Sequence, residues 1–491
     1  MSKSTTKYTI ISTLLFIFVF VQFDFDGSAK ESKNLNLKKE AFQKVDQLSE
    51  TLNDAAKKIW EFAEIHLAEY KSSKLLADLL EQNGFNIQPN AGGLPTAFVA
   101  TYGTGQPVIG ILGEFDALPG LSQKDYTLIQ EPVTPKAPGH GCGHNLFGVG
   151  SAGAAIAIKT VMEQHHLKGT VKFFGCPSEE TAEGKIYMAR DGVFLGLDIC
   201  LDWHPSDEND VSMETSNALN NFEVIFHGKT AHAAGDPWNG RGALDAVELM
   251  DIGVNYMREH VPVTVRMHYV IADGGRAPNI VPDTARAWYF VRGKDRHEVE
   301  DVYARVLKIA EGAALMTDTT HEIRFITGIY NYLKNNAIGS VMHQNLQLVN
   351  VPAYTPEEQE FAKQLQKKLG KKEQGMSTKI KPFTGPKEYM GGGSTDAADV
   401  SWLVPTVSLG TACMPMEIPG HHWGVVACVA SSLGYKGMQT ASKVLAATAI
   451  DALTDPSVIK KAREEFKEKT KDFVYKSALP AGQKPPVVEN K

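Results

Sequence analysis

The chain has 491 residues, of which 43% are hydrophobic and 22% charged, so it can bury the cores of two or more domains. Its formal net charge of -7, with no long block of one sign, excludes the basic surface that nucleic-acid binding needs, and we expect no nucleic-acid partner. The five cysteines are few and odd in number, which excludes a disulfide framework as the organising feature.

The N-terminus predicts an exported protein. Lys3 and Lys7 precede the apolar run Tyr8–Val21, which is followed by Gly27-Ser28-Ala29. A basic start, a short apolar core and a small-residue exit are typical of a signal peptide, so we assign residues 1–29 to one and expect a periplasmic or secreted protein. An uncleaved membrane anchor is the alternative. No later stretch approaches the ~18 apolar residues of a span, so we expect no membrane contact beyond the leader.

Strand and helix patterns alternate after the leader. Lys39–His66 has helical periodicity, and a second helix is expected at Leu146–Gln164. The expected strands are Thr96–Tyr102, Val108–Leu112, Thr170–Phe174 and Ile199–Asp202. This alternation predicts an α/β fold, a layered domain with a mostly parallel mixed sheet, in which ligands gather outside the carboxyl ends of the strands.

Residues 219–331 have a different pattern and predict an inserted domain. The expected elements are, in order, the strand Asn221–Phe226, the helix Ala243–His260, the strands Val265–Ile271 and Ala285–Val291, the helix Asp295–Met316 and the strand Glu322–Ile326. The order βαββαβ is that of a ferredoxin-like α+β unit. The layered domain then comprises residues 30–218 and 332–476, with a capped helix beginning at Thr355. The Pro-rich, polar segment 477–491 is expected to be a flexible tail.

Four short clusters of ligand-type side chains follow predicted strands or precede helices. They are Gly139-His140-Gly141-Cys142-Gly143-His144-Asn145, Ser178-Glu179-Glu180, Asp202-Trp203-His204-Pro205 and Gly420-His421-His422-Trp423. Taken singly, each has an ordinary alternative, such as a buried cysteine or a pair of solvated acids. Together, a thiol, several imidazoles and paired carboxylates at successive strand ends favour a metal site that activates water.

At this point the chain resembles the zinc- and manganese-dependent amidohydrolases that include hippurate hydrolase, plant auxin-conjugate hydrolases, aminoacylases and related carboxypeptidases. The motifs that carry the resemblance are Gly113-Glu114-Phe115-Asp116-Ala117-Leu118-Pro119, Cys142-Gly143-His144, Glu179-Glu180, His204, Gly228-Lys229-Thr230-Ala231-His232 and His421. Asn145, Pro237-Trp238-Asn239-Gly240-Arg241 and Gly393-Ser394-Thr395-Asp396 are most similar to the branch of p-aminobenzoyl-glutamate hydrolases. His422 departs from that branch, as does the export signal, since a folate-salvage enzyme is expected in the cytoplasm.

The resemblance implies a hydrolase that cleaves the amide bond of an N-acyl amino acid, such as p-aminobenzoyl-glutamate, at a site of two divalent metal ions, zinc or manganese. The implied ligands are Cys142, His144, Glu180, His204 and His421, with His422 as an alternative to His421. Glu179 is implied as the general base, and His232, from the same chain or from a partner copy, as the oxyanion donor. Asp116 and Asp396 are implied to orient ligands or contact substrate, as is Asn279, for which a plain turn role beside Pro278 is the alternative. Residues 219–331 are implied to serve as a lid and to form a homodimer.

Other readings of the sequence stay open. The same chemistry could serve a dipeptide or another small N-acyl amino acid, and a binding protein without activity could use the same scaffold. Gly148-Val149-Gly150-Ser151-Ala152-Gly153 matches a dinucleotide-binding pattern, but it follows the Cys-Gly-His loop instead of a strand. We therefore interpret it as a close contact between helix and sheet.

Overall fold

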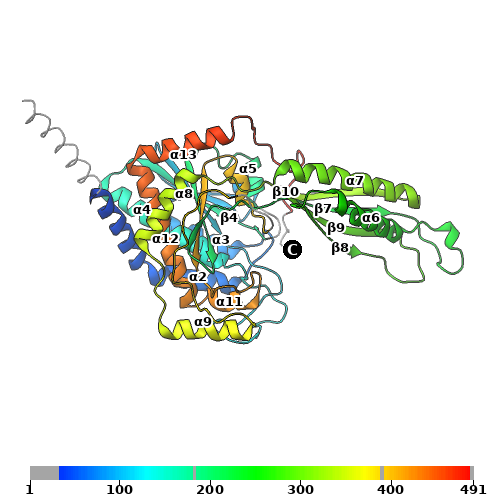
Figure 1. The fold of residues 1–491 in the computed structure, drawn as a ribbon, viewed down its shortest axis with the longest axis horizontal. Helices are drawn as coiled ribbons and strands as arrows, with labels where there is room; N and C mark the ends of the chain where they lie inside the picture. The colour runs from blue at the N-terminus through cyan, green and yellow to red at the C-terminus, as the bar shows by residue number, and fades with distance from the viewer. Residues whose placement is uncertain (1–31, 181–183, 388–391, 487–491) are drawn as a thin grey trace, which may run out of the picture.

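The computed structural model describes residues 32–180, 184–387 and 392–486, and it has a larger layered domain with a narrower domain projecting from one side (Figure 1). The signal peptide expected at residues 1–29 lies outside the described residues. The helix expected at Lys39–His66 forms, but it is interrupted by a turn at Leu48.

The larger domain contains a seven-stranded sheet in the order β1-β2-β4-β3-β5-β11-β6. Its strands are β1 (Asn86–Pro89), β2 (Phe98–Thr104), β3 (Val108–Glu114), β4 (Gly169–Cys176), β5 (Ile199–Ser206), β6 (Asp210–Ser212) and β11 (Thr406–Ala412). The four central strands are parallel, and the outer pairings are antiparallel. The predicted mixed α/β sheet is therefore confirmed, with its parallel part at the centre.

Helices cover this sheet. Those before the inserted domain are α2 (Ser49–Phe62), α3 (Tyr70–Gln82), α4 (His144–His165) and α5 (Gly184–Arg190). Those after it are α8 (Asn336–Val349), α9 (Pro356–Lys368), α10 (Ala397–Ser401), α11 (Trp423–Val429), α12 (Ser432–Thr454) and α13 (Pro456–Lys469). The capping box predicted at the helix that begins after Thr355 is present, between Thr355 and Glu358.

Helix α4 packs directly on the sheet because its glycines allow a close approach. A Cβ at Gly148 would lie 2.6 Å from the carbonyl oxygen of Glu114, and one at Gly150 would lie 2.7 Å from the ring of Trp203. The glycine pattern therefore serves helix–sheet packing, as the sequence suggested. By length and composition α4 could also cross a membrane, but 89% of its most apolar stretch is buried inside the protein.

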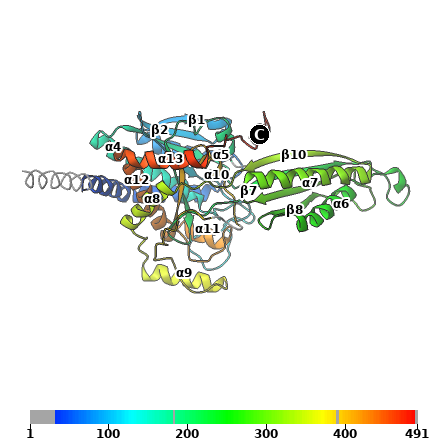
Figure 2. The same ribbon diagram turned by 45° about the horizontal axis from the view of Figure 1, so that its top comes forward.

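The inserted domain is a four-stranded antiparallel sheet in the order β10-β7-β9-β8 with two helices on one face (Figure 2). Its elements are β7 (Ala218–His227), α6 (Ala243–Met257), β8 (Arg266–Asp273), β9 (Thr284–Gly293), α7 (Arg296–Thr317) and β10 (Thr320–Ile329). The domain has its own core, which includes Phe222, Val247, Tyr289 and Val302. The predicted ferredoxin-like βαββαβ fold is confirmed.

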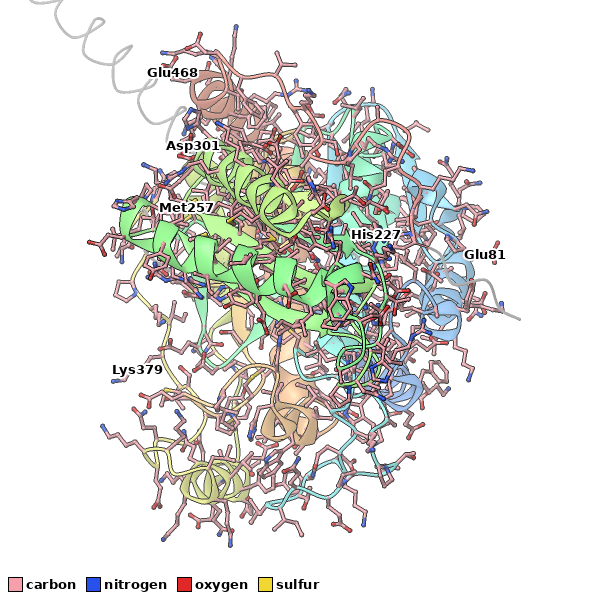
Figure 3. All side chains as sticks on the ribbon, turned by 90° about the vertical axis from the view of Figure 1, so that its right-hand side faces the viewer. Glu81, His227, Met257, Asp301, Lys379 and Glu468 are labelled. Atoms are coloured by element: carbon pink, nitrogen blue, oxygen red, sulfur yellow. The ribbon has the colours of Figure 1, made fainter. Side chains whose placement is uncertain are left out.

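The inserted domain joins the larger domain at the ends of β7 and β10. Ala218 and Ile329 lie at this base, whereas His227, Thr284 and Thr320 lie together at the outer end. In Figure 3 this outer end points toward the viewer.

The segment after residue 476, which the sequence predicts to be a flexible tail, has specific contacts as far as it is described. Leu479 is buried, and the side chain of Gln483 donates to the carbonyl oxygen of Ile326 at 2.7 Å. Pro486 lines the cavity at the base of the inserted domain. These contacts could not be predicted from the Pro-rich composition of the segment.

Candidate active site

The ends of the parallel strands place most of the candidate residues. Glu114 ends β3, Glu179 and Glu180 follow β4, and His204 is on β5. His144 is the first residue of α4, and Cys142 precedes it in a tight turn at Gly143, whose φ is 82°. These positions bring together side chains from four segments, because the carboxyl ends of parallel strands meet at one edge of the sheet.

Cys142, His144 and His204 form a first group whose ligand atoms all lie within 4.8 Å of one another. Cys142 Sγ is 3.4 Å from His204 Nε2. The other ring nitrogens are engaged: His144 Nδ1 bonds with Asp116 at 2.9 Å, and His204 Nδ1 donates to the carbonyl oxygen of Pro205 at 2.7 Å. A metal-binding histidine is usually oriented in this way, with its second nitrogen held by a carboxylate or a carbonyl group.

Cys142, Glu180 and His421 form a second group, again with ligand atoms within 4.8 Å. Glu180 Oε2 lies 3.3 Å from His421 Nε2, and the backbone N–H of Glu180 donates to Asp116 at 2.9 Å. The side chain of His422 has a different partner: its Nδ1 accepts a hydrogen bond from the backbone N–H of Gly424 and caps α11. The structure thus brings His421 to the cluster, and Cys142 belongs to both groups.

Glu179 belongs to a third group, together with Glu114 and His144. Burial and the charges of Glu114 and Glu180 raise the pKa of Glu179 well above its usual value. A carboxylate with a raised pKa is suited to accept a proton and release it again near neutral pH.

The cluster holds more acidic groups than can ionise together without a cation. Burial and the charge of Glu180 raise the pKa of the Cys142 thiol. Burial lowers the pKa of His144, but the charges of Cys142, Glu114 and Asp116 prevail and raise it well above its usual value. A divalent cation bound among these groups would stabilise the ionised thiolate and carboxylates.

Buried polar atoms that lack hydrogen-bond partners among the described residues also fit a metal centre. Glu180 Oε1 is buried and has no hydrogen-bond partner within the described ranges. Glu114 Oε2 and His144 Nε2 are 3.1 Å apart, but no well-aligned hydrogen bond joins them. Thiolate and imidazole donors suit zinc, and imidazole and carboxylate donors also suit manganese.

A buried ion network behind the cluster was not found from the sequence. Lys185 Nζ lies 2.6 Å from Glu114 and 2.6 Å from Asp396. Asp396 also accepts from the backbone N–H of Lys185 at 2.8 Å and is fully buried, so it supports the site from behind and does not face the substrate. Glu114 lies within a motif that the sequence analysis named, whereas nothing in the sequence around Lys185 indicates a role in the site.

His232 and Asn279 are absent from the cluster of their own chain. They lie at the outer end of the inserted domain, where the backbone N–H of Ala233 donates to the carbonyl oxygen of Asn279. His232 is exposed, and its Nδ1 accepts from the backbone N–H groups of Ala234 and Gly235 at 3.2 and 3.0 Å. Because Nδ1 accepts, the neutral tautomer of this ring carries its proton on Nε2.

A cavity of about 680 Å³ separates the cluster from the base of the inserted domain. The larger domain contributes Cys142, Glu179, Glu180, His204 and His421 to its walls, and the inserted domain contributes Trp288, Phe290 and Arg292. Arg292 Nη1 donates to the hydroxyl of Ser394 at 2.9 Å, which joins the two walls. The sequence singled out the motif of Ser394 but not Arg292.

Comparison with known proteins agrees with this geometry. The chain is 38% identical to one of the subunits of p-aminobenzoyl-glutamate hydrolase from Escherichia coli K12, over 88% of this chain and 95% of that protein. It belongs to the M20 family of metal-dependent hydrolases. The family model of the peptidase dimerisation domain matches residues 216–318, which lie within the structure's inserted domain apart from two residues before β7.

The chain is also similar to other hydrolases and peptidases. The chain is 28% identical to mouse Xaa-Arg dipeptidase, over 89% of this chain and 93% of that protein. Two solved structures share the fold: an aminobenzoyl-glutamate utilization protein from Klebsiella pneumoniae and a dinuclear metal-binding peptidase of the M20 family from Bacillus subtilis. Their TM-scores are 0.58 and 0.54, at 18% and 19% identity. Each alignment covers 83% of this chain, with 97% and 99% of the respective structures.

These findings confirm the predicted family and fold. As an M20 hydrolase, the chain is a metal-dependent amidohydrolase. It has candidate metal-binding residues in the groups described above.

Proposed function

We propose that this hydrolase cleaves p-aminobenzoyl-glutamate or a closely related N-acyl amino acid at a centre of two metal ions that share Cys142. The observation that carries the proposal is that Cys142 belongs to both ligand groups, with Glu179 beside them. His144 and His204 would complete one ion's ligands, and Glu180 and His421 the other's. Zinc or manganese bound there supplies a lowered pKa for the attacking water and a polarised substrate carbonyl.

Glu179 is the proposed general base. Its side chain lines the cavity and lies within the cluster, so it can take a proton from the attacking water. It then delivers that proton to the leaving nitrogen when the C–N bond breaks. The products are a carboxylic acid and an amine, and Glu179 returns to its starting form.

Arg292 is the proposed partner of the substrate's carboxylate. It lies on β9 at the base of the inserted domain, across the cavity from the cluster, with Ser394 beside it. A guanidinium group binds a carboxylate through two parallel hydrogen bonds, which fits the amino-acid half of an N-acyl amino acid.

We also propose a homodimer in which His232 acts in the partner's site. His232 lies at the outer end of the inserted domain, and the base that faces the cluster is at the other end of β7. This position supports a role in the site of a partner copy. Ile252, Tyr256 and Val263, on and just after α6, are exposed apolar residues that a second copy could cover. His232 would then donate a hydrogen bond to the oxyanion that forms on the substrate carbonyl.

Export is a further part of the proposal. It rests on the basic start, the apolar run and the small residues before residue 30. The N-terminal residue of the protein recovered from periplasm or medium tests it: a mature chain that begins near residue 30 is expected, and an intact Met1 in the cytoplasm would contradict it.

The activity is tested with metal-loaded full-length protein on a panel of p-aminobenzoyl-glutamate, other N-acyl amino acids and dipeptides. We expect release of the free amino acid from p-aminobenzoyl-glutamate, and no release after removal of metal with a chelator. Turnover of dipeptides alone would replace the proposed substrate with a peptide. No turnover of any amide by protein with two bound metals would contradict the proposal and favour a binding protein.

A further inference from the structure

A second cavity, of about 440 Å³, adjoins the first cavity at the metal cluster. It shares His204 and the loop residues Gly393, Ser394 and Thr395 with the first cavity. A substrate held at the cluster can therefore extend into either cavity. The second cavity has polar walls, formed mainly by β5, β6 and β11 and by Tyr332 and Lys334.

Sheet register places Asp202 and Asp210 in this cavity close to the cluster. Asp202 precedes His204 by two residues on β5, so both side chains are on the same side of the strand, roughly 6.6 Å apart along it. Gly410 of β11 pairs with His204 on one side and with Asp210 on the other. A Cβ at Gly410 would lie 2.7 Å from Asp210 Oδ1, so a side chain at this position would displace the Asp210 carboxylate.

Asp202 has an unused acceptor in this cavity. The residue is 5% exposed, and its Oδ2 accepts a hydrogen bond from the hydroxyl of Tyr332 at 3.3 Å. Its Oδ1 is buried and has no hydrogen-bond partner among the residues that the structure describes. A buried carboxylate oxygen that accepts no hydrogen bond costs folding free energy. Such an oxygen in a cavity wall therefore indicates that a bound molecule donates a hydrogen bond to it.

The charges of the cavity wall favour a donor that is basic or carries N–H groups. The carboxylates of Asp202, Asp210 and Glu214 lie near the ammonium group of Lys334, which is 3.6 Å from the ring centre of Tyr332, and Asp210 also lies near Lys381. Lys381, the other cation of the wall, pairs with Glu208. The first cavity differs in that its wall holds the guanidinium group of Arg292 beside the carboxylates of Glu179, Glu180 and Glu223.

We propose that the second cavity is the subsite for the acyl half of the substrate and that it selects acyl groups ending in an N–H donor. Such a donor is either an arylamine or an aliphatic ammonium group, and Asp202 Oδ1 accepts its hydrogen bond. The carboxylate of the amino-acid half then lies in the first cavity with Arg292, and the scissile amide lies between the two at the cluster. This inference rests on the proposed amide hydrolysis and adds the class of acyl group.

Two pairs of substrates of equal shape test the inference on the metal-loaded enzyme. One pair is 4-aminobenzoyl-glutamate and 4-methylbenzoyl-glutamate, and the other is 6-aminohexanoyl-glutamate and heptanoyl-glutamate. The measured quantity is the ratio of kcat/KM for the amino compound to kcat/KM for its methyl partner. We expect a ratio of at least about ten in one pair, since a site built to bond an N–H group discriminates against an analogue that lacks it. The pair that shows the preference identifies the donor as arylamine or ammonium.

Variants connect that preference to the cavity. In Asp202→Asn and in Asp210→Asn the ratio is expected to fall at least threefold, whereas Glu163→Gln, at an exposed pair with Lys159 on α4, is expected to keep it. A second readout needs no turnover: the Glu179→Gln variant should bind 4-aminobenzoate more tightly than 4-methylbenzoate in calorimetry, and the Asp202→Asn change should remove the difference. Because two cavity variants and one control are measured, the test stays decisive if one of the two cavity variants fails to fold.

The outcomes separate this inference from the proposed function. Hydrolysis of all four amides with ratios near one, or a ratio that persists in both aspartate variants, overturns the acyl subsite and leaves the hydrolase in place. Hydrolysis of none of the four, together with selective binding of 4-aminobenzoate that depends on Asp202, overturns the hydrolase and supports the subsite.

Discussion

Lys185 Nζ lies 2.6 Å from Glu114 Oε1 and holds a second carboxylate, that of Asp396, at the same distance. The three side chains are at most 2% exposed, so their charges are shielded from water. They join the end of β3, the start of α5 and the residue that precedes α10. Glu114 also belongs to the ligand group of Glu179, so the network fixes a residue beside the proposed base.

Replacing Lys185 with methionine should destabilise the protein strongly, because it leaves two buried carboxylates without their cation. Removal of one partner from a buried pair typically lowers the free energy of unfolding by about 3–5 kcal/mol. Urea unfolding measures the loss. The triple variant Lys185→Met, Glu114→Gln, Asp396→Asn serves as a matched control and should recover a large part of it. Unchanged stability of the single variant would show that the network does not contribute as described.

Glu179→Gln should remove turnover and retain the metals. The amide keeps the shape of the side chain but cannot accept the proton, so kcat should fall by about 10²- to 10⁴-fold. Metal content per chain, measured by elemental analysis, should equal that of the unchanged protein, since Glu179 is not among the proposed ligands. A parallel loss of metal would move Glu179 from the role of base to that of ligand.

Mixed dimers test whether His232 acts across the subunit interface. Glu179→Ala and His232→Ala proteins should each be nearly inactive. After dissociation and reassembly together, a mixed dimer has one site with an intact Glu179 and the partner's intact His232. The mixture should recover about one quarter of the normal activity per chain, if subunits combine at random. Recovery of none, with mixed dimers demonstrated by mass spectrometry, would place His232 in its own chain's site or outside the reaction.

Stability should depend on pH through Glu69, a fully buried residue that accepts hydrogen bonds from the Leu67 backbone and the Thr96 hydroxyl. Burial and the charge of Asp116 raise the pKa of Glu69 to about 8. The folded chain keeps this proton up to that pH, whereas the unfolded chain releases it near the usual pKa of 4.5. The free energy of unfolding therefore falls as pH rises from about 4.5 to 8, by at most about 5 kcal/mol.

Glu69→Gln should remove that slope, because the amide does not titrate. The measurement is the urea midpoint of the metal-free protein at pH 5 and at pH 8, with and without the substitution. An equal loss of stability at pH 8 in both proteins would assign the slope to other groups.

Much of the fold could be predicted from the sequence because its signals are local. The order βαββαβ follows from short runs of hydrophobic periodicity, and the structure has that order between Ala218 and Ile329. The ligand clusters could be found because each of them directly follows a strand or precedes a helix. The alternation of strands and helices in the larger domain likewise predicted its mixed sheet.

The rest depends on contacts between distant segments. Lys185 pairs with Asp396 across 211 positions, and neither its neighbours nor its spacing indicates that pairing. The choice between His421 and His422 needed the backbone, which turns one ring toward Glu180 and the other onto α11. Arg292 is one of two charged residues on β9, and only the register of the strand places it at the cavity.

Metal titration of the metal-free protein tests the central claim most directly. Zinc or manganese is added in steps to full-length protein, and both the bound metal and the hydrolysis of p-aminobenzoyl-glutamate are measured. We predict that activity rises with bound metal and reaches its plateau at two ions per chain. In Cys142→Ser, which weakens the residue shared by both ligand groups, less metal should bind and activity should fall with it. Full activity in protein freed of metal, or unchanged binding of two ions by the Cys142→Ser variant, would contradict a shared metal centre at this site.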